Sequence, residues 1–504
     1  MDLTVRLRGL RDALSLGLVE REIPLRLALL AALAGEHLLL LGPPGTAKSL
    51  LARRLRLAFR DATLFERLLT RFSVPEELFG PLSLKALEDD RYERATKGFL
   101  PTAQVAFLDE IFKANSAILN ALLTLLNERE FDNGTMRQKA PLVAVVAASN
   151  ELPEGEELAA LYDRFLLRCH VGPVSDEGFE QLLDLGPETT VTVADPLLLS
   201  AEELSEIRSR AARIPLSPEA RQLLRDARTF HRDRGIPVSD RRFRKIVGLL
   251  RVSALTCGRD EVSLWDCALL VHATWDTPER EAEVRDFYAS RIGLSGREGE
   301  ELPRLLDALT RRLEEDQASR TQARDEEGLL LYGDAGTTPV RTPKGRVQRR
   351  SAAGEALFVR PSSWGVDRTN GGQGFTEQEL DFDHRNRSFR AWEGREAYLL
   401  DPGSFFAEER ELLPHLEPTR FSEGHVAAAT RDAEELLRAL AQHRDGLGRT
   451  LAAVPREVTA HLWLDPDTDQ IATAQLSARL ARVEQWLLLA DALVTGFRAL
   501  PVRP

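Results

Sequence analysis

The feature that most constrains the fold is a short apolar strand that runs directly into a glycine-rich loop. Residues 38–49 read LLLLGPPGTAKS, and the amphipathic stretch LLARRLRLAF that follows predicts a helix beginning near Ala47. Such a loop can turn its backbone N–H groups inward, and the helix adds the positive end of its dipole, so together they can bind phosphate. The sequence therefore predicts an α/β domain with a phosphate-binding loop.

The residues of this loop have separate predicted roles. The backbone cradle is predicted to consist of Gly42, Pro43, Pro44, Gly45, Thr46 and Ala47. Lys48 would reach the β- and γ-phosphates of ATP, and the Ser49 hydroxyl would hold Mg²⁺. Ala47 stands where the general pattern GxxxxGK[ST] has glycine, so the match is a variant, and a chance strand–turn–helix is the alternative.

Two carboxylates end a second apolar run. VAFLDE, residues 105–110, places Asp109 and Glu110 at the carboxyl edge of a predicted buried parallel strand, next to the phosphate loop. Asp109 would bind Mg²⁺ through water, and Glu110 would polarise the attacking water. The alternative is an acidic strand end that caps the next helix.

A third apolar run, LVAVVAASN, ends in Asn150. Its side-chain amide could orient the same water and contact the γ-phosphate, although an asparagine after a strand is more often a turn former. Before this run, a helix is predicted from Ser116 to Asn127, and Asn133-Gly134 predicts a two-residue hairpin. After it, a helix is predicted to break at Asp163-Arg164 into another strand.

These stretches, in this order and spacing, resemble the MoxR group of AAA+ ATPases, and most closely its RavA-like branch. They are GPPGTAKS, TRFSVPEELFGPL, TKGFLP, VAFLDE, LLNERE, AASNELPE and LYDRF. The resemblance covers Val19 to about Trp275. Ala47 in place of glycine is usual in that branch, and SVPEELFGPLS corresponds to the insertion in the second helix that marks the clade.

The resemblance implies an ATP-driven hexameric ring. Lys48 and Ser49 would be its Walker A residues, Asp109 and Glu110 its Walker B residues, and Asn150 its sensor 1.

By the same resemblance, Arg164 would be the arginine finger that reaches the ATP of a neighbouring subunit. The alternatives are an arginine that interacts with a helix C-terminus, and Arg168 as the finger. Val19 would help to wall the adenine, with simple core packing as the alternative.

Residues 201–275 resemble a four-helix lid. Ser217-Pro218 predicts a helix start and Ser263–Asp266 a capping box. The third lid helix opens with Ser239-Asp240-Arg241-Arg242, and a helix start is unfavourable for cations unless an anion is near. One of the two arginines, preferably Arg241, is the sensor 2 candidate, which would contact the γ-phosphate from above; the alternative is a solvated pair facing Asp240 and Asp260.

Beyond Trp275 the pattern changes. A charged helix is predicted from Glu300 to about Gln322, helices return from Ser404 to Leu500, and the piece between them is rich in glycine and short β-like runs. This layout is similar to the discontinuous helical domain of RavA-like proteins. The predicted domains are an AAA+ α/β subdomain (1–195), a helical lid (196–280), a discontinuous helical domain (281–327 and 401–504), and a β-rich or partly mobile insert for partner binding (328–400).

Composition excludes some partners. With 504 residues and a net charge of −12, the chain has material for about three domains but no broad basic field for nucleic acid. A local basic run at 338–350 is expected to be a mobile loop, with a nucleic-acid or lipid patch as the alternative. Three cysteines without metal spacing fit a reducing cytoplasm. No secretory signal is evident, and the longest apolar stretch is too short to span a membrane.

Two functions remain. The preferred one is an ATPase ring that remodels or matures a client protein, commonly in this family with a partner carrying a von Willebrand factor A domain. The alternative is a slow nucleotide-gated scaffold that presents its insert to a partner. Glu110, Asn150 and Arg164 together favour the enzyme, because a pure switch does not need all three. Charge disfavours a DNA-acting motor.

Overall fold

The chain forms two compact units. The computed structural model describes residues 2–185, 191–291, 298–333, 338–348, 353–355, 357–358, 375–376, 381–383, 388–393, 396–400 and 407–503. One unit consists of Met1–Pro303 with Ala439–Trp486, and the other of Arg304–Arg438 with Leu487–Pro504. Among the described residues, the helices lack a segment long and apolar enough to cross a membrane.

The first unit is built on a parallel sheet of five strands in the order β2-β3-β6-β1-β7. They are β1 (Leu38–Leu41), β2 (Leu64–Leu68), β3 (Val105–Asp109), β6 (Ala144–Ser149) and β7 (Leu167–His170). Every residue of β1 and β6 is buried, which explains their continuous apolar sequence. Because the strands are parallel, the residues that follow β1, β3 and β6 meet at one edge of the sheet.

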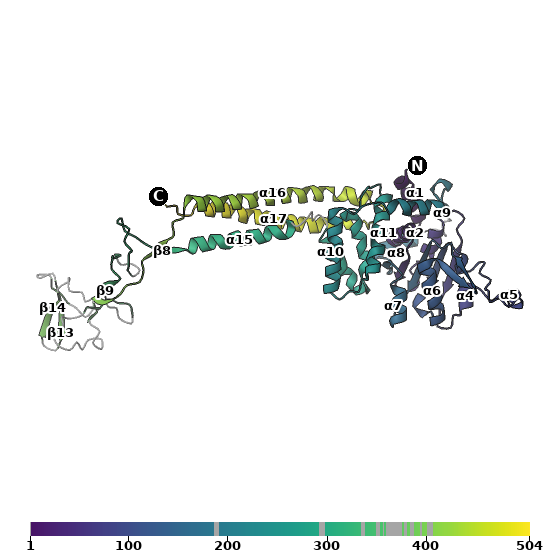
Figure 1. The fold of residues 1–504 in the computed structure, drawn as a ribbon, viewed down its shortest axis with the longest axis horizontal. Helices are drawn as coiled ribbons and strands as arrows, with labels where there is room; N and C mark the ends of the chain where they lie inside the picture. The colour runs from purple at the N-terminus through teal and green to yellow at the C-terminus, as the bar shows by residue number, and fades with distance from the viewer. Residues whose placement is uncertain are drawn as a thin grey trace. The chain divides into compact units, whose positions relative to one another are not determined.

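Helices and short turns surround this sheet (Figure 1), and α2 and α3 pack against its strands. The helices are α1 (Leu3–Ser15), α2 (Glu22–Ala34), α3 (Lys48–Arg56), α4 (Pro75–Phe79), α5 (Leu84–Glu88), α6 (Ser116–Glu128), α7 (Glu156–Tyr162) and α8 (Asp176–Asp184). The predicted helix over 116–127 is thus confirmed to within one residue, as is the break after Tyr162.

The predicted hairpin exists, but its turn is shifted by one residue. β4 (Glu130–Asn133) pairs with β5 (Met136–Lys139), and Asn133 is paired with Met136, so Gly134 and Thr135 form the turn. Asn133 is excluded from the turn because its buried side chain binds the backbone of Arg94: Arg94 N–H donates to Oδ1 (2.6 Å) and Nδ2 donates to Arg94 O (3.2 Å).

The helical lid follows the sheet. Its helices are α9 (Ala201–Ala211), α10 (Pro218–Asp233), α11 (Asp240–Thr256), α12 (Leu264–Cys267), α13 (Val271–Thr274) and α14 (Glu281–Ala289). Both predicted helix starts are confirmed: the Ser217 hydroxyl accepts from Ala220 N–H (3.1 Å), and Ser263 N–H donates to the Asp266 carboxylate (2.9 Å) in a capping box.

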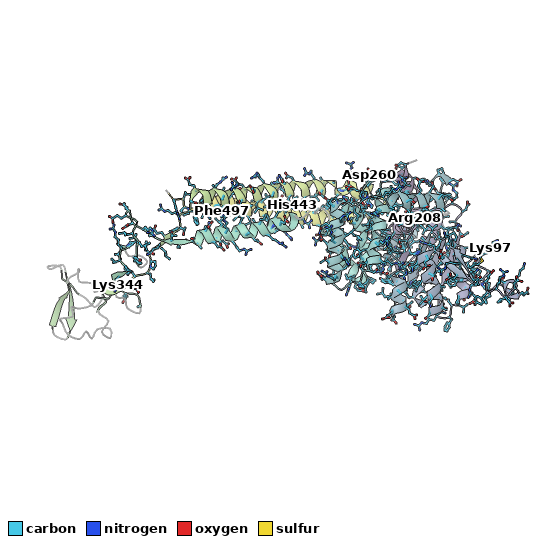
Figure 2. The ribbon with its side chains drawn as sticks, in the orientation of Figure 1. Lys97, Arg208, Asp260, Lys344, His443 and Phe497 are labelled. Atoms are coloured by element: carbon cyan, nitrogen blue, oxygen red, sulfur yellow. The ribbon has the colours of Figure 1, made fainter. Side chains whose placement is uncertain are left out.

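The second unit contains parts of three long helices and a set of short strands. The helices are α15 (Glu298–Ala318), α16 (Glu423–Ala460) and α17 (Thr468–Arg498). Phe497, labelled in Figure 2, is fully buried, and the Arg312 guanidinium lies 5.9 Å from its ring centroid. Arg312 also pairs with Asp432 of α16 at 3.1 Å, so side chains from all three helices meet.

The strands of this unit form small antiparallel sheets: β8 (Arg320–Gln322) with β16 (Leu416–Pro418), β9 (Lys344–Gln348) with β15 (Ala407–Glu411), β10 (Leu357–Phe358) with β11 (Phe375–Thr376), and β12 (Asp381–Asp383) with β13 (Ser388–Glu393) and β14 (Glu396–Leu400). The helix predicted from Ser404 was therefore placed too early: the described residues between 407 and 418 include two strands, and α16 begins at Glu423. The division into four domains stays a prediction.

The basic run at 338–350 was expected to be a loop, and part of it is a strand instead. Lys344–Gln348 form β9, which pairs with β15 in a register that places Lys344 opposite Glu411. Opposite charges at cross-strand positions favour this pairing. Residues 349 and 350 lie outside the described part of the chain.

The crossover between α16 and α17 is buried in the first unit. Leu462 and Trp463 are at most 1% exposed, and they belong to the same apolar core as the sheet and the lid. The Trp463 indole N–H donates to Thr256 Oγ1 (2.8 Å), and His461 Nε2 lies 3.2 Å from Asp266 Oδ1. The segment between α16 and α17 thus contributes to the core of the unit that contains the phosphate loop.

Candidate nucleotide site

The phosphate loop closes tightly on itself after β1. At Gly42 (φ 152°) a Cβ atom would lie 2.1 Å from the Val171 carbonyl oxygen, so another residue does not fit there. The Lys48 ammonium donates to Gly42 O (2.9 Å) and Pro43 O (2.7 Å), which places it at the centre of the loop. The loop can therefore present backbone N–H groups and one buried cation to a phosphate.

Ala47 explains why the general pattern has glycine at its position. It is the residue before α3, and its backbone is left-handed, with φ 62° and ψ 23°. This conformation costs an L-residue about 1–2 kcal/mol, whereas glycine adopts it freely. Alanine at position 47 therefore makes this loop conformation more costly than glycine would.

The two carboxylates lie where the sequence predicts. Asp109 ends β3, and its Oδ1 accepts from the N–H of Glu110 (3.1 Å). Glu110 has a left-handed backbone (φ 53°), a strained conformation that is frequent at functional sites. Its Oε2 is buried, lies 3.2 Å from Lys113 Nζ and has no hydrogen-bond partner. Glu110 thus has an oxygen able to accept from another group.

The charges of these groups influence Lys48. Burial is the largest effect and lowers the pKa of Lys48 below its ordinary value, while the nearby charges of Asp109 and Glu110 act to raise it. A phosphate bound in the loop would likewise favour the charged form of the ammonium.

Ser49 and Asp109 line one cavity of about 410 Å³, which β2 and the segment after it complete. A hydroxyl and a carboxylate are oxygen ligands of the kind that Mg²⁺ takes when phosphates and water supply the rest of its coordination. Within the part of the chain that the structure describes, no group of three or more His, Cys, Asp and Glu residues could hold a metal alone. The residues present thus fit Mg²⁺ bound together with a nucleotide.

A larger cavity of about 1000 Å³ is lined by the phosphate loop itself. Its lining includes the loop residues Pro43–Ala47, the apolar residues Leu18, Val19, Val174, Leu182 and Val191, and the arginines Arg21, Arg53, Arg54 and Arg56. An apolar compartment next to a phosphate loop can hold a nucleotide base. Val19 is 9% exposed, so it both packs and faces the cavity, and the two alternatives for this residue are compatible.

Asn150 lies at the same edge of the sheet. It follows β6, and the preceding residue, Ser149, is paired with Leu41 and accepts a hydrogen bond from Gly42 N–H (3.0 Å). The side chain of Asn150 is exposed. The amide is therefore next to the start of the phosphate loop and free of the core.

Arg242 is not a solvated cation at a helix start. It is 1% exposed, and its guanidinium donates to the carbonyl oxygens of Ala273 (2.6 Å), Phe165 (3.0 Å) and Leu166 (2.7 Å). It also donates to the backbone oxygen and the carboxylate of Asp163. These acceptors offset the unfavourable placement of a cation at the start of a helix. Because they belong to both subdomains, Arg242 joins the lid to the sheet subdomain.

Arg168 is likewise buried. Its guanidinium lies 3.7 Å from the centroid of the Tyr162 ring and donates to Trp275 O. Burial, followed by repulsion from Arg242, lowers the pKa of Arg168 to about 9. Its position leaves Arg164 as the better candidate for contact with another molecule.

Arg164 and Arg241 are close to each other. Arg241 is exposed and donates to Asn127 Oδ1 at the end of α6. Burial is the largest cause that lowers the pKa of Arg164, and repulsion from Arg241 is the second. The Arg164 Nε is buried without a hydrogen-bond partner. Neither arginine is among the residues that line the cavity around the phosphate loop.

Comparison with known proteins gives the family. A family model for the MoxR domain in MoxR-vWA-beta-propeller ternary systems matches residues 5–209, and one for an AAA lid domain matches residues 219–288. Two uncharacterized proteins of Methanocaldococcus jannaschii are each 42% identical, over 275 residues (54% of this chain, 72% of the relative) and 277 residues (54% and 70%). The chain belongs to the MoxR family of AAA+ ATPases.

The chain is also similar to a crystal structure of a protein from Cytophaga hutchinsonii, which is named only provisionally as an ATPase. The match covers 57% of the chain described here and 94% of the Cytophaga protein, at 19% identity and with a TM-score of 0.46. In the MoxR-family chain described here, the fold is the parallel-sheet α/β AAA+ subdomain followed by its lid.

Sequence reasoning missed two neighbours of Val19 that support this MoxR-family site. Glu20 accepts from Ser175 N–H (2.8 Å) and from the Ser175 hydroxyl, at the start of α8. Arg21 is buried and donates to Thr46 O in the phosphate loop. In the sequence both belong to a charged run, GLVERE, which is typical of a solvated surface, so only the fold could show their contacts.

Proposed function

We propose that this chain is a RavA-like MoxR ATPase, in which Mg²⁺-dependent ATP hydrolysis at the subunit boundaries of a hexameric ring drives chaperone-like remodelling or maturation of a client protein. The observation that carries this proposal is the convergence of Lys48, Ser49, Asp109 and Glu110 at one sheet edge, around one loop. A phosphate-binding loop, a lysine, a hydroxyl that can hold Mg²⁺ and a pair of carboxylates are the groups that phosphoryl transfer to water requires.

Each group has a proposed role. Lys48 and the loop N–H groups bind the phosphates, and Ser49 and Asp109 hold Mg²⁺, which would neutralise charge on the phosphate oxygens. Glu110 takes the proton of the attacking water, and Asn150 orients that water. Val19 walls the base.

The ring is proposed from the two arginines. Arg164 and Arg241 share one region of the surface, and neither lines the cavity of its own phosphate loop. The Arg164 side chain is 20% exposed and its Nη1 lies 3.9 Å from the Asp163 carboxylate, a long contact that leaves the guanidinium able to bind a further anion. We therefore assign Arg164 as the finger, and Arg241 as sensor 2, toward the nucleotide of an adjacent subunit.

The proposed partner carries a von Willebrand factor A domain. The family model that matches residues 5–209 is described for MoxR-vWA-beta-propeller ternary systems, and this description supports the partner class. The RavA-like assignment is supported by Ala47 and by helical sequence on both sides of a strand-rich insert. A cytoplasmic location stays a prediction.

Mixed assemblies test the proposed function. The purified chain should hydrolyse ATP with Mg²⁺, and Arg164→Ala subunits should regain activity when mixed with Lys48→Ala subunits, because one boundary then pairs an intact loop with an intact finger. Steady-state phosphate release measures this recovery. Lys48→Ala mixed with Glu110→Gln is the matched control and should stay inactive, since both changes damage the same half of the boundary. Absence of recovery in the first mixture would remove the ring assignment.

The scaffold alternative is favoured by one observation, namely a second compact unit with its own strands. β9 and β15 pair Gln348 with Ala407, so these ends lie about 5 Å apart. Replacing residues 349–406 by a short Gly/Ser linker should leave hydrolysis within about a few-fold of the parent, because closing a short loop between adjacent ends costs little. The same variant should lose the partner in a pull-down. Loss of hydrolysis would instead place this segment in the catalytic unit.

A further inference from the structure

The segment between α1 and α2 touches several walls of the nucleotide cavity. Val19 lines its apolar part, Glu20 binds the start of α8, and Arg21 reaches the phosphate loop. Arg21 itself lines the cavity although only 7% of its surface is exposed. Of these three described residues, it is the one whose side chain makes a hydrogen bond to the loop.

All three hydrogen bonds of the Arg21 guanidinium go to backbone carbonyl oxygens. Nε donates to Thr46 O (3.0 Å), Nη1 to Glu20 O (2.7 Å) and Nη2 to Gly172 O (2.8 Å). Gly172 follows β7, so the planar group joins the phosphate loop to the end of a neighbouring strand. A guanidinium provides this fixed fork, whereas an ammonium does not.

The bond to Thr46 O fixes the orientation of one peptide group. In a trans peptide the C=O and the following N–H point in opposite directions. When Arg21 holds the Thr46 carbonyl, the Ala47 N–H is therefore directed away from Arg21. The same peptide precedes Ala47, whose left-handed backbone is costly for an L-residue. The contact thus acts at the position where this loop departs from the glycine pattern.

We propose that Arg21 is a positioning residue for nucleotide binding, which holds the Thr46–Ala47 peptide in the orientation that a bound phosphate needs and offsets the strain of alanine at position 47. The proposal rests on the assignment of this loop as the ATP site. In this proposal Arg21 acts on the backbone at Ala47 through its hydrogen bond to Thr46 O, and is not a general surface or core arginine.

The test measures the affinity of purified variants for a fluorescent ADP analogue, together with their kcat, KM and unfolding temperature without nucleotide. Arg21→Met should raise Kd about 10–100-fold, the range expected for losing a hydrogen bond from a charged group. The Kd of Arg21→Lys should lie between those of the parent and of Arg21→Met, because lysine keeps the positive charge but lacks the planar donor geometry of the guanidinium. KM should follow Kd, and kcat at saturating ATP should stay within a few-fold.

Arg208→Met is the matched control. Arg208, labelled in Figure 2, also donates to two backbone carbonyls, those of Leu33 (2.9 Å) and Ala32 (2.8 Å), at the end of α2 that precedes β1. Its replacement should lower the unfolding temperature and leave Kd within about two-fold of the parent, since the loop is not touched. If Arg21→Met and Arg21→Lys behave like this control, with lower unfolding temperature and unchanged Kd, the proposal is wrong.

Combining each Arg21 variant with Ala47→Gly tests the link to strain. Glycine adopts the left-handed backbone without cost, so the Kd penalty of losing Arg21 should be several-fold smaller in the Ala47→Gly background. If the loss of Arg21 raises Kd equally in the parent and Ala47→Gly backgrounds, the proposal that Arg21 offsets the strain at position 47 is wrong. A parent chain that binds no ADP analogue would instead contradict the ATP-site assignment itself, and the two failures are thereby distinguished.

Discussion

Lys48→Ala is expected to remove nucleotide binding. The Lys48 ammonium is buried at the centre of the loop, and its carbonyl partners Gly42 and Pro43 belong to the loop itself. Without it, a bound phosphate loses its charged donor, which corresponds to a loss of affinity on the order of 100-fold or more. Equilibrium titration with an ATP analogue measures the effect.

Glu110→Gln is expected to keep that affinity and to lose turnover by about 10²–10⁴-fold, the contribution of a general base. The amide keeps the shape of the side chain at a partly buried, strained position but cannot accept a proton. Titration and single-turnover hydrolysis together separate the two variants. Equal loss of affinity in Lys48→Ala and Glu110→Gln would contradict the division of roles between ground-state binding and the reacting water.

Arg242→Ala should destabilise the first unit by roughly 3–5 kcal/mol, because it removes a fully buried cation and leaves several buried carbonyl oxygens and the Asp163 carboxylate without their donor. Thermal and urea unfolding of the full chain measure the loss. The expected result is a lower midpoint with a preserved fold of the remaining lid.

The neighbouring residue provides the control. Arg241 is exposed and its bond goes to one side chain, that of Asn127, so Arg241→Ala should change the unfolding free energy by less than about 0.5 kcal/mol. It should nevertheless reduce ATP turnover if its role at an adjacent nucleotide is correct. A large stability loss in Arg241→Ala, or none in Arg242→Ala, would reverse the assignment of the two arginines.

The sequence was informative wherever local pattern and chemistry coincide. The all-apolar strands read as buried because both faces of a parallel sheet are covered, and the polar residues that end them meet at one edge for the same reason. Lys48, Ser49, Asp109 and Glu110 could therefore be placed together from the amino-acid sequence alone. The Ser217 and Ser263 caps were predictable because capping involves residues within one helical turn.

Long-range contacts of charged residues were not predictable in this way. Arg21 and Arg242 are buried, and their hydrogen-bond acceptors include backbone carbonyl oxygens of segments that are distant in the sequence. The spacing of residues in the sequence does not indicate which distant carbonyls will lie near an arginine. Two adjacent arginines, Arg241 and Arg242, look equivalent in the sequence although Arg241 is exposed and Arg242 is buried. The turn at Gly134 was misplaced for a related reason, since Asn133 is held by the remote backbone of Arg94.

The buried crossover between α16 and α17 has a consequence for the order of synthesis. The unit that contains the phosphate loop ends its first part at Pro303 and is completed only by Ala439–Trp486. At the usual rate of translation, the ribosome needs roughly 10–40 s to make the chain between these points. During that interval Thr256 and Asp266 are without Trp463 and His461, and Arg304–Arg438 is synthesised before the catalytic core can close. Each newly made ATPase unit therefore reaches its final packing after most of the second unit has emerged.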